Sequence, residues 1–200
     1  MQVTYIKVAA EISPRHDLLV IVDNTFLTPH FQQPLDLGAD VVIHSGTKYL
    51  GGHNDTLAGF LIVNDPALSN QLRFLYKTVG SCLAPFDSWL LLRGIKTLAL
   101  RVEKQQANAR SIAQWLKTQP QVKAVFYVGL PEHPGYAISC QQASGFGSMI
   151  SLRVDTKAIA EQVLRRISLI QFAESLGGTE SLLTYPMMQT HADLPAAERE

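Results

Sequence analysis

The sequence predicts an α/β fold, in which a sheet of short strands is packed against helices. In the first half, short unbroken apolar runs end at turn-forming residues and are separated by segments of a different character. In the second half, apolar residues recur at helical spacing, and strand-like runs return after Pro120. With 200 residues, of which 46% are hydrophobic, the chain is long enough for one large domain or two small ones.

Three strands are predicted in the first half of the chain. Residues 8–15 are typical of the end of a helix, and Leu18–Val22 follows as a continuous apolar run that ends directly before Asp23. Such a run is expected of a strand that is buried on both faces. Val41–Ile43 is a second short buried strand, followed by a turn-rich segment, and Ala58–Val63 is the third strand.

Helices are predicted next, over Ala67–Lys77 and over Pro85–Gln114, with a break at Gly94. The last part of the chain is predicted to hold three strands and one helix: Val122–Val128, Phe146–Val154, Ile167–Ala173 and the helix Thr156–Arg166. This part resembles a second, smaller α/β unit. We therefore place a domain boundary near Thr97, which divides the chain into residues 1–98 and 99–200.

The composition excludes several classes of protein. Lys plus Arg and Asp plus Glu both total 17, so no charge excess favours nucleic acid or an anionic membrane as a partner. No apolar run is long enough to cross a bilayer, and the first ten residues lack the apolar stretch of a signal peptide. Cys82 and Cys140 form no metal or redox motif, so we interpret them as buried thiols in a cytoplasmic protein.

Polar residues follow two of the predicted strands. Asp23 comes directly after the first strand, and Ser45, Thr47 and Lys48 come shortly after the second. Ligands of α/β sheets bind at the carboxyl ends of strands, so these side chains are expected around one crevice. An amine can form a Schiff base with an aldehyde, a carboxylate can keep a pyridine nitrogen protonated, and hydroxyls can donate to a phosphate.

Each of these features has a commoner structural explanation when it is taken alone. An aspartate at a strand end often caps a helix or forms a turn, and a lysine after a turn is usually solvated. The segment around Lys48 lacks the Gly-Lys-Ser/Thr order of a nucleotide-binding loop. His30, His44 and His53 lack the spacing of a zinc-binding helix, so no metal site is expected.

Several strings of the sequence resemble one known family. VIVDNTFLTPHFQQPLDLGADVVIHSGTKYLGGHNDTLAG (Val20–Gly59) is similar to the signature region of the Cys/Met-metabolism enzymes that depend on pyridoxal 5'-phosphate (PLP). The likeness continues in three further strings: LLLRGIKTLALR (Leu90–Arg101), GFGSMISL (Gly145–Leu152) and AESLGGTESLLTYPMMQTHADLP (Ala173–Pro195). Because it runs through independent motifs over nearly the whole chain, we regard the resemblance as specific.

The resemblance implies roles for six residues. Asp23 in VDNT matches the aspartate that pairs with the pyridine nitrogen, and Lys48 in SGTKYL matches the catalytic lysine that forms a Schiff base with PLP. Ser45 and Thr47 match hydroxyls that bind the cofactor phosphate. In the ESLGG string, Ser175 matches a residue that helps to hold the substrate carboxylate, and Glu174 lies where cystathionine enzymes have a glutamate near the distal end of the substrate.

Glu174 bears on the choice of substrate. A carboxylate at this position favours a longer substrate with a second amino group, because it attracts the distal ammonium. The alternative is that Glu174 is simply a solvated charge.

The resemblance also implies a fold and an extent. We expect the type I PLP-dependent transferase fold, similar to aspartate aminotransferase: residues 1–98 form part of the large-domain mixed sheet, and residues 99–200 form much of the small C-terminal domain. Family members are considerably longer at both ends, so the chain is expected to be incomplete. They form homodimers that pair into homotetramers, which we expect here if both ends are present.

The implied activity is γ-elimination or γ-replacement on cystathionine or an O-acylhomoserine, as in cystathionine γ-lyase and cystathionine γ-synthase. Cystathionine β-lyase and O-acetylhomoserine sulfhydrylase are alternatives within the family. A PLP enzyme of the same fold with other chemistry, such as transamination, is a further alternative. A hypothesis of a different class is a truncated fragment without catalytic activity.

Overall fold

The computed structural model describes residues 2–189 and has the α/β architecture that the sequence predicts. A three-stranded sheet holds β1 (Ile21–Asp23), β2 (Val41–Ser45) and β3 (Gly59–Ile62) in that order. β1 is parallel to β2, with Asp23 opposite Ile43, whereas β2 and β3 are antiparallel. The sheet is therefore mixed, and Asp23 and Ser45 end neighbouring parallel strands on the same side.

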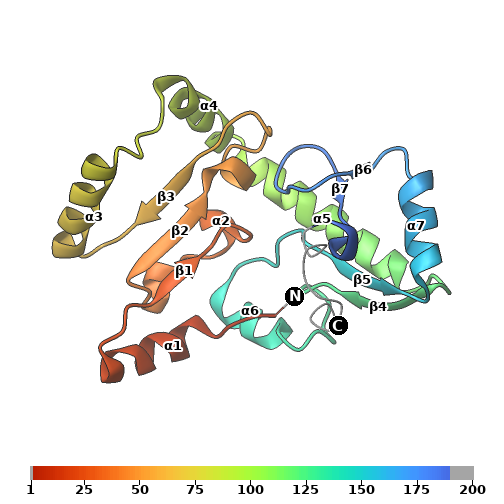
Figure 1. Ribbon diagram of the computed structural model, residues 1–200. Helices are drawn as coiled ribbons and strands as arrows, with labels where there is room; N and C mark the ends of the chain where they lie inside the picture. The colour runs from red at the N-terminus through yellow and green to blue at the C-terminus, as the bar shows by residue number, and fades with distance from the viewer. Residues whose placement is uncertain (1, 190–200) are drawn as a thin grey trace.

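Helices surround this sheet in Figure 1. They are α1 (Ile6–Ile12), the short α2 (Thr28–Phe31), α3 (Pro66–Val79) and α4 (Pro85–Ile95). Asp65 caps α3 by accepting a hydrogen bond from the amide of Leu68, and Pro66 opens the helix with a backbone that is already helical. The predicted break near Gly94 is confirmed, because α4 ends at Ile95 and α5 (Leu98–Leu116) begins three residues later.

The rest of the chain forms two further two-stranded sheets and two helices around α5 (Figure 1). An antiparallel pair joins β4 (Val122–Phe126) to β5 (Ser151–Val154), with α6 (Tyr136–Gln142) between them in sequence. A parallel pair joins β6 (Gln171–Phe172) to β7 (Leu182–Leu183). The helix α7 (Lys157–Arg166) is capped by the Thr156 side chain. Short 3-10 turns cover Ser13–His16, Pro34–Leu37 and Pro186–Met188.

The helix α5 contributes to two hydrophobic cores. Its first turns place Leu98 and Val102 in a cluster with Phe31, Tyr49 and Leu50. Its later turns place Ala109 and Ala113 against Tyr127 and Leu130. One helix therefore packs against both parts of the chain, and the division at residue 98, which falls at its first residue, stays a prediction.

Two expectations about burial were wrong. The run before Asp23 is not buried on both faces, because β1 is an edge strand and Leu18, Leu19 and Ile21 are 62%, 60% and 56% exposed. The expectation that Cys82 and Cys140 are buried was wrong as well, because both are free and exposed.

Within residues 2–189, no helix combines the length and the apolar character that crossing a bilayer requires.

Candidate active site around Lys48

Lys48 lies in a short π-helical turn, Gly46–Leu50, directly after β2. The amide of Gly51 donates to the carbonyl of Gly46 at 2.9 Å, which closes the wide turn, but Lys48 itself has a non-helical backbone (φ −94°, ψ −127°). A β-carbon at Gly46 would lie within 2.9 Å of Phe60 and Ala58 side-chain atoms. Glycine therefore lets the turn lie close against β3, and π-turns of this kind occur frequently at functional sites.

Asp23 and Ser45 are connected through Thr25. The hydroxyl of Thr25 donates to Oδ1 of Asp23 at 2.6 Å, and its amide donates to the same oxygen at 3.0 Å. The Thr25 hydroxyl also accepts from the backbone amide of Ser45 at 2.8 Å. Both contacts from Thr25 reach Oδ1, so Oδ2 of Asp23 is left for another donor. Thr25 therefore fixes the carboxylate relative to the end of β2.

A cavity of about 740 Å³ brings together three of the predicted residues: Asp23, Ser45 and Lys48 all line it. The rest of its wall comes from the first residues of the chain, from β1 and the residues that follow it, and from later segments that include the loop Phe146–Met149. A carboxylate, a hydroxyl and an amine therefore face one space, as the strand-end argument predicts.

Thr47 faces a second hollow, of about 630 Å³, together with Ser175. The Thr47 hydroxyl accepts from the amide of Ala58 at 3.0 Å and lies 3.3 Å from the Ala58 carbonyl, so it is already bonded to the backbone of the residue before β3. Asp55 and Asp87 line the same hollow. The structure therefore separates Thr47 from the cavity that holds Asp23 and Ser45.

Lys48 joins the two hollows, because its Nζ donates to Oγ of Ser175 at 3.2 Å. The contact depends on a close approach of two backbones. Gly177 has φ +85°, and a β-carbon there would lie 2.5 Å from the amide nitrogen of Tyr49 and 2.8 Å from the carbonyl carbon of Lys48. The ESLGG string thus packs directly on the lysine turn. The preceding Glu174 is exposed.

Burial shifts the ionisation of two neighbours of the site. Desolvation lowers the pKa of the buried His44 below its ordinary value, and the negative charge of Asp23 opposes the shift. Desolvation raises the pKa of Tyr49, whose hydroxyl lies 2.9 Å from Oγ of Ser148. Burial therefore favours the neutral imidazole of His44 and the neutral phenol of Tyr49.

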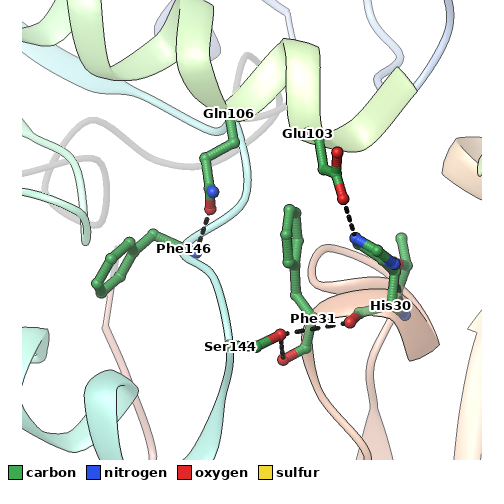
Figure 2. A network of polar contacts seen from close by, with 7 residues as sticks. His30, Phe31, Glu103, Gln106, Ser144 and Phe146 are labelled. Atoms are coloured by element: carbon green, nitrogen blue, oxygen red, sulfur yellow. Dashed lines mark hydrogen bonds and ion pairs between the residues drawn. The ribbon is translucent and has the colours of Figure 1, made fainter. Parts of the chain in front are cut away.

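Polar contacts from α5 hold the cavity wall in place (Figure 2). Gln106 accepts a hydrogen bond from the amide of Phe146, and Oε1 of Glu103 lies 3.0 Å from Nε2 of His30. Ser144 reaches the carbonyl of Phe31 at 3.3 Å. Phe146–Ile150, predicted as the start of a strand, is a loop: the Phe146 amide bonds to Gln106 of α5, and the Gly147 carbonyl accepts from the Tyr127 hydroxyl.

Thr25 is the residue of this site that sequence reasoning missed. The signal was present in the string VDNT, because a threonine two residues after a strand-end aspartate can bond back to its carboxylate.

The last six residues of the string AESLGGTESLLTYPMMQTHADLP, THADLP, begin at Thr190 and lie outside the described residues. Within the described part, no group of three or more His, Cys, Asp or Glu side chains could hold a metal ion.

Known proteins resemble the chain over nearly its whole length. The model of the family described as "Cys/Met metabolism PLP-dependent enzyme" matches residues 1–200. Cystathionine β-lyase of Lactococcus lactis subsp. cremoris is 48% identical over 100% of this chain and 53% of its own length. Cystathionine γ-synthase of Haemophilus influenzae is also 48% identical, over 95% of this chain and 47% of its own. The chain spans about half the length of the curated relatives it matches.

Solved structures share the fold. Cystathionine γ-lyase from Lactobacillus plantarum, complexed with L-serine, superposes with a TM-score of 0.95 at 43% identity, over 99% of this chain and 52% of that chain. Cystathionine γ-synthase from Xanthomonas oryzae pv. oryzae, with aminoacrylate and cysteine, gives a TM-score of 0.95 at 39% identity, over 99% and 51%. The expected fold of PLP-dependent cystathionine enzymes is thereby confirmed.

Proposed function

This chain belongs to the family of Cys/Met metabolism PLP-dependent enzymes, and from that premise we propose that it carries the lysine-bearing part of a trans-sulfuration enzyme. The proposed reaction is γ-elimination or γ-replacement on cystathionine or an O-acylhomoserine. The observation that carries the proposal is the single cavity lined by Asp23, Ser45 and Lys48.

The residues present fit pyridoxal phosphate. The cofactor needs an amine for its aldehyde, a carboxylate for its ring nitrogen and donors for its phosphate. Lys48 supplies the amine, Asp23 presents Oδ2 once Oδ1 is bonded to Thr25, and Ser45 supplies a hydroxyl at the same cavity. Thr47, which opens to the neighbouring hollow, is proposed as a second phosphate contact beside Ser45.

When bound, pyridoxal phosphate supplies a ring that withdraws electrons from the substrate Cα. Lys48 would hold the cofactor through a Schiff base to its aldehyde, and its amine would move protons at the substrate Cα and at Cβ. Asp23 keeps the proton on the ring nitrogen. Ser175, which accepts from Lys48 at 3.2 Å, orients the amine and is proposed to help hold the substrate carboxylate.

Glu174 is proposed to select the substrate. Its carboxylate is exposed and precedes Ser175, so it can attract a distal ammonium. Cystathionine carries such an ammonium. Relatives named cystathionine γ-synthase and cystathionine γ-lyase support a reaction at the γ-carbon.

A second candidate is β-elimination. Relatives from Lactococcus lactis, Coxiella burnetii and Arabidopsis thaliana carry the name cystathionine β-lyase at 44–48% identity, which favours cleavage on the other side of the sulfur. Cystathionine supplied to the chain distinguishes the reactions: pyruvate reports β-elimination and 2-oxobutyrate reports γ-elimination. Thioether formation from an O-acylhomoserine and cysteine reports γ-replacement, and amino-group transfer to an oxoacid reports transamination.

A second copy of the chain is proposed as the partner, in a homodimer or homotetramer of the intact enzyme. Apolar side chains remain exposed on β1, α3 and α4, and surfaces of that kind mark protein contacts. They include Ile21, Phe74, Phe86, Trp89 and Leu92. Sedimentation with and without the cofactor tests the assembly.

The deciding experiment is titration of the chain with pyridoxal phosphate. We expect a visible absorbance band from the Schiff base with Lys48, which is lost in Lys48→Ala and kept in Lys104→Ala, where an exposed lysine of α5 is removed. A folded parent chain that forms no band contradicts the proposal and favours a fragment without catalytic activity.

A further inference from the structure

The helix α5 reaches both loops that meet at Lys48, through two side chains one helical turn apart. Arg101 and Gln105 occupy positions i and i+4, so they lie on the same face of the helix. Nη1 of Arg101 donates to the carbonyl of Tyr49 at 2.8 Å, and Nε2 of Gln105 donates to the carbonyl of Gly178 at 2.8 Å. The first carbonyl is next to Lys48, and the second is three residues after Ser175.

Arg101 completes the hydrogen bonding of the lysine turn. The carbonyls of Gly46 and Lys48 are bonded by the amides of Gly51 and Gly52. The Tyr49 carbonyl instead receives the Arg101 guanidinium. Because carbonyls at a helix end need hydrogen-bond donors from outside the helix, Arg101 acts as a side-chain cap on a turn whose central residue is non-helical.

The same guanidinium ties the turn to α4. Nη2 of Arg101 donates to the carbonyl of Gly94 at 2.9 Å, and Nε donates to Oγ1 of Thr97 at 3.1 Å. Gly94 and Gly52 are both needed for this approach. A β-carbon at Gly94 would lie 2.2 Å from the Gly51 carbonyl oxygen, and one at Gly52 would lie 2.1 Å from Nη1 of Arg101.

Arg101 is partly buried without a carboxylate partner. None of the ion pairs among residues 2–189 includes it, and desolvation lowers the pKa of its guanidinium. Removing even part of a cation from water is costly, and the planar fork of three donors directs this one at two carbonyls and a hydroxyl in fixed geometry. A lysine at this position could not reach all three acceptors.

We propose that Arg101 and Gln105 are positioning residues that hold the Lys48 turn and the Ser175 loop together and so set the Lys48–Ser175 contact. Gln105 fixes one loop and Arg101 fixes the other, and Gly177 is where the two backbones touch. The catalytic meaning of the contact rests on the proposed function, but the contact itself can be measured without the cofactor.

The test is a double-mutant cycle in the cofactor-free chain. The rate at which an amine-directed acetylating ester modifies Lys48 is followed by peptide mass spectrometry. We expect Ser175→Ala to raise this rate about 3- to 10-fold in the parent, because the amine loses its acceptor. In Arg101→Gln or Gln105→Met, the same substitution is expected to change the rate less than twofold.

Lys104→Gln is the matched control, because it alters an exposed residue between the two positions, and it should keep the full effect of Ser175→Ala. The proposal is overturned if Ser175→Ala changes the acetylation rate equally in the parent and in folded Arg101→Gln and Gln105→Met. It is also overturned if Ser175→Ala has no effect in the parent. If Arg101→Gln fails to fold, the effect of Ser175→Ala in Gln105→Met decides the test, since methionine keeps the volume of the glutamine side chain.

Cofactor loading separates the two proposals. A chain that shows the coupling but gives no visible band with pyridoxal phosphate refutes the proposed function and leaves the positioning role standing. A band in the parent refutes the positioning role alone if Ser175→Ala has the same effect on the acetylation rate in Arg101→Gln and Gln105→Met as in the parent. Where both hold, the band of Arg101→Gln is expected to form about 10- to 100-fold more slowly.

Discussion

Nζ of Lys48 lies 3.2 Å from Oγ of Ser175, although 127 positions separate the two residues in the chain. The lysine follows β2 in the first half, and the serine precedes β7 near the end of the described chain. One hydrogen bond therefore joins the two parts of the chain at the group that is expected to do the chemistry.

Ser175→Ala is expected to lower the turnover of the cofactor-loaded chain about tenfold, because the amine loses one hydrogen-bond partner and some of its orientation. The measurement is the rate of Cα hydrogen exchange of an amino-acid substrate in heavy water. Ser181→Ala, at an exposed serine of the same segment, is the control and should leave the rate unchanged. A normal exchange rate in Ser175→Ala would remove Ser175 from the site.

Asp23→Asn is expected to lower the same exchange rate on the order of 100-fold, since an amide gives weaker electrostatic support to a protonated ring nitrogen than a carboxylate does. The proposed Schiff base with Lys48 should still form, and its visible band should persist. Asp36→Asn, on the 3-10 turn Pro34–Leu37, is the matched control. Equal rates in both variants would contradict the role given to Asp23.

Thr25→Val is expected to destabilise the chain by about 1–3 kcal/mol, because the amide of Ser45 and Oδ1 of Asp23 both lose a hydroxyl partner in a partly buried setting. Thr25→Ser keeps the hydroxyl and should retain most of the stability. Urea denaturation of the two variants measures the difference in the free energy of unfolding. If valine and serine cost the same, the hydroxyl has no bridging role.

The strand-end argument predicted that Asp23, Ser45 and Lys48 face one crevice, and all three line one cavity. Asp23 and Lys48 are 25 positions apart, but the parallel pairing of β1 with β2 follows from two apolar runs, and it brings the residues after each run to one cavity. Ser45 lies where the argument places it. These residues could be predicted because their positions depend on local pattern and a short connection.

The rest depended on contacts that no local pattern contains. Thr47 turns toward the second hollow because its hydroxyl bonds the backbone of Ala58, eleven positions away. The approach of Gly177 to Lys48 and the reach of Arg101 to Tyr49 are set by how α5 packs, not by spacing along the chain. The pairing of β6 with β7 was also missed, since each strand has only two residues.

Gly177→Ala is expected to cost several kcal/mol of stability, about 1–2 kcal/mol from the left-handed backbone and more from overlap with the Lys48–Tyr49 peptide. Gly80→Ala is the matched control. Gly80 has a similar φ of +78°, but a β-carbon there would meet nothing within 4 Å. The difference in the free energy of unfolding between the two variants isolates the close approach. Equal values would show that the Gly177 backbone can move away from Lys48 without penalty.

The buried His44 should make stability depend on pH in mildly acidic solution. Burial lowers its pKa in the folded chain, whereas the unfolded side chain keeps the ordinary value of 6.5, so below that value the unfolded chain binds the proton first. Stability from this residue is therefore present above pH 6.5 and is lost as the pH falls from there through the lower folded pKa.

His44→Gln removes the titration, so the free energy of unfolding of this variant should fall less over the same range. His16→Gln, at an exposed histidine, should keep the slope of the parent chain. Urea denaturation at closely spaced pH values measures all three slopes, and a parent slope that survives in His44→Gln would assign the titration to another group.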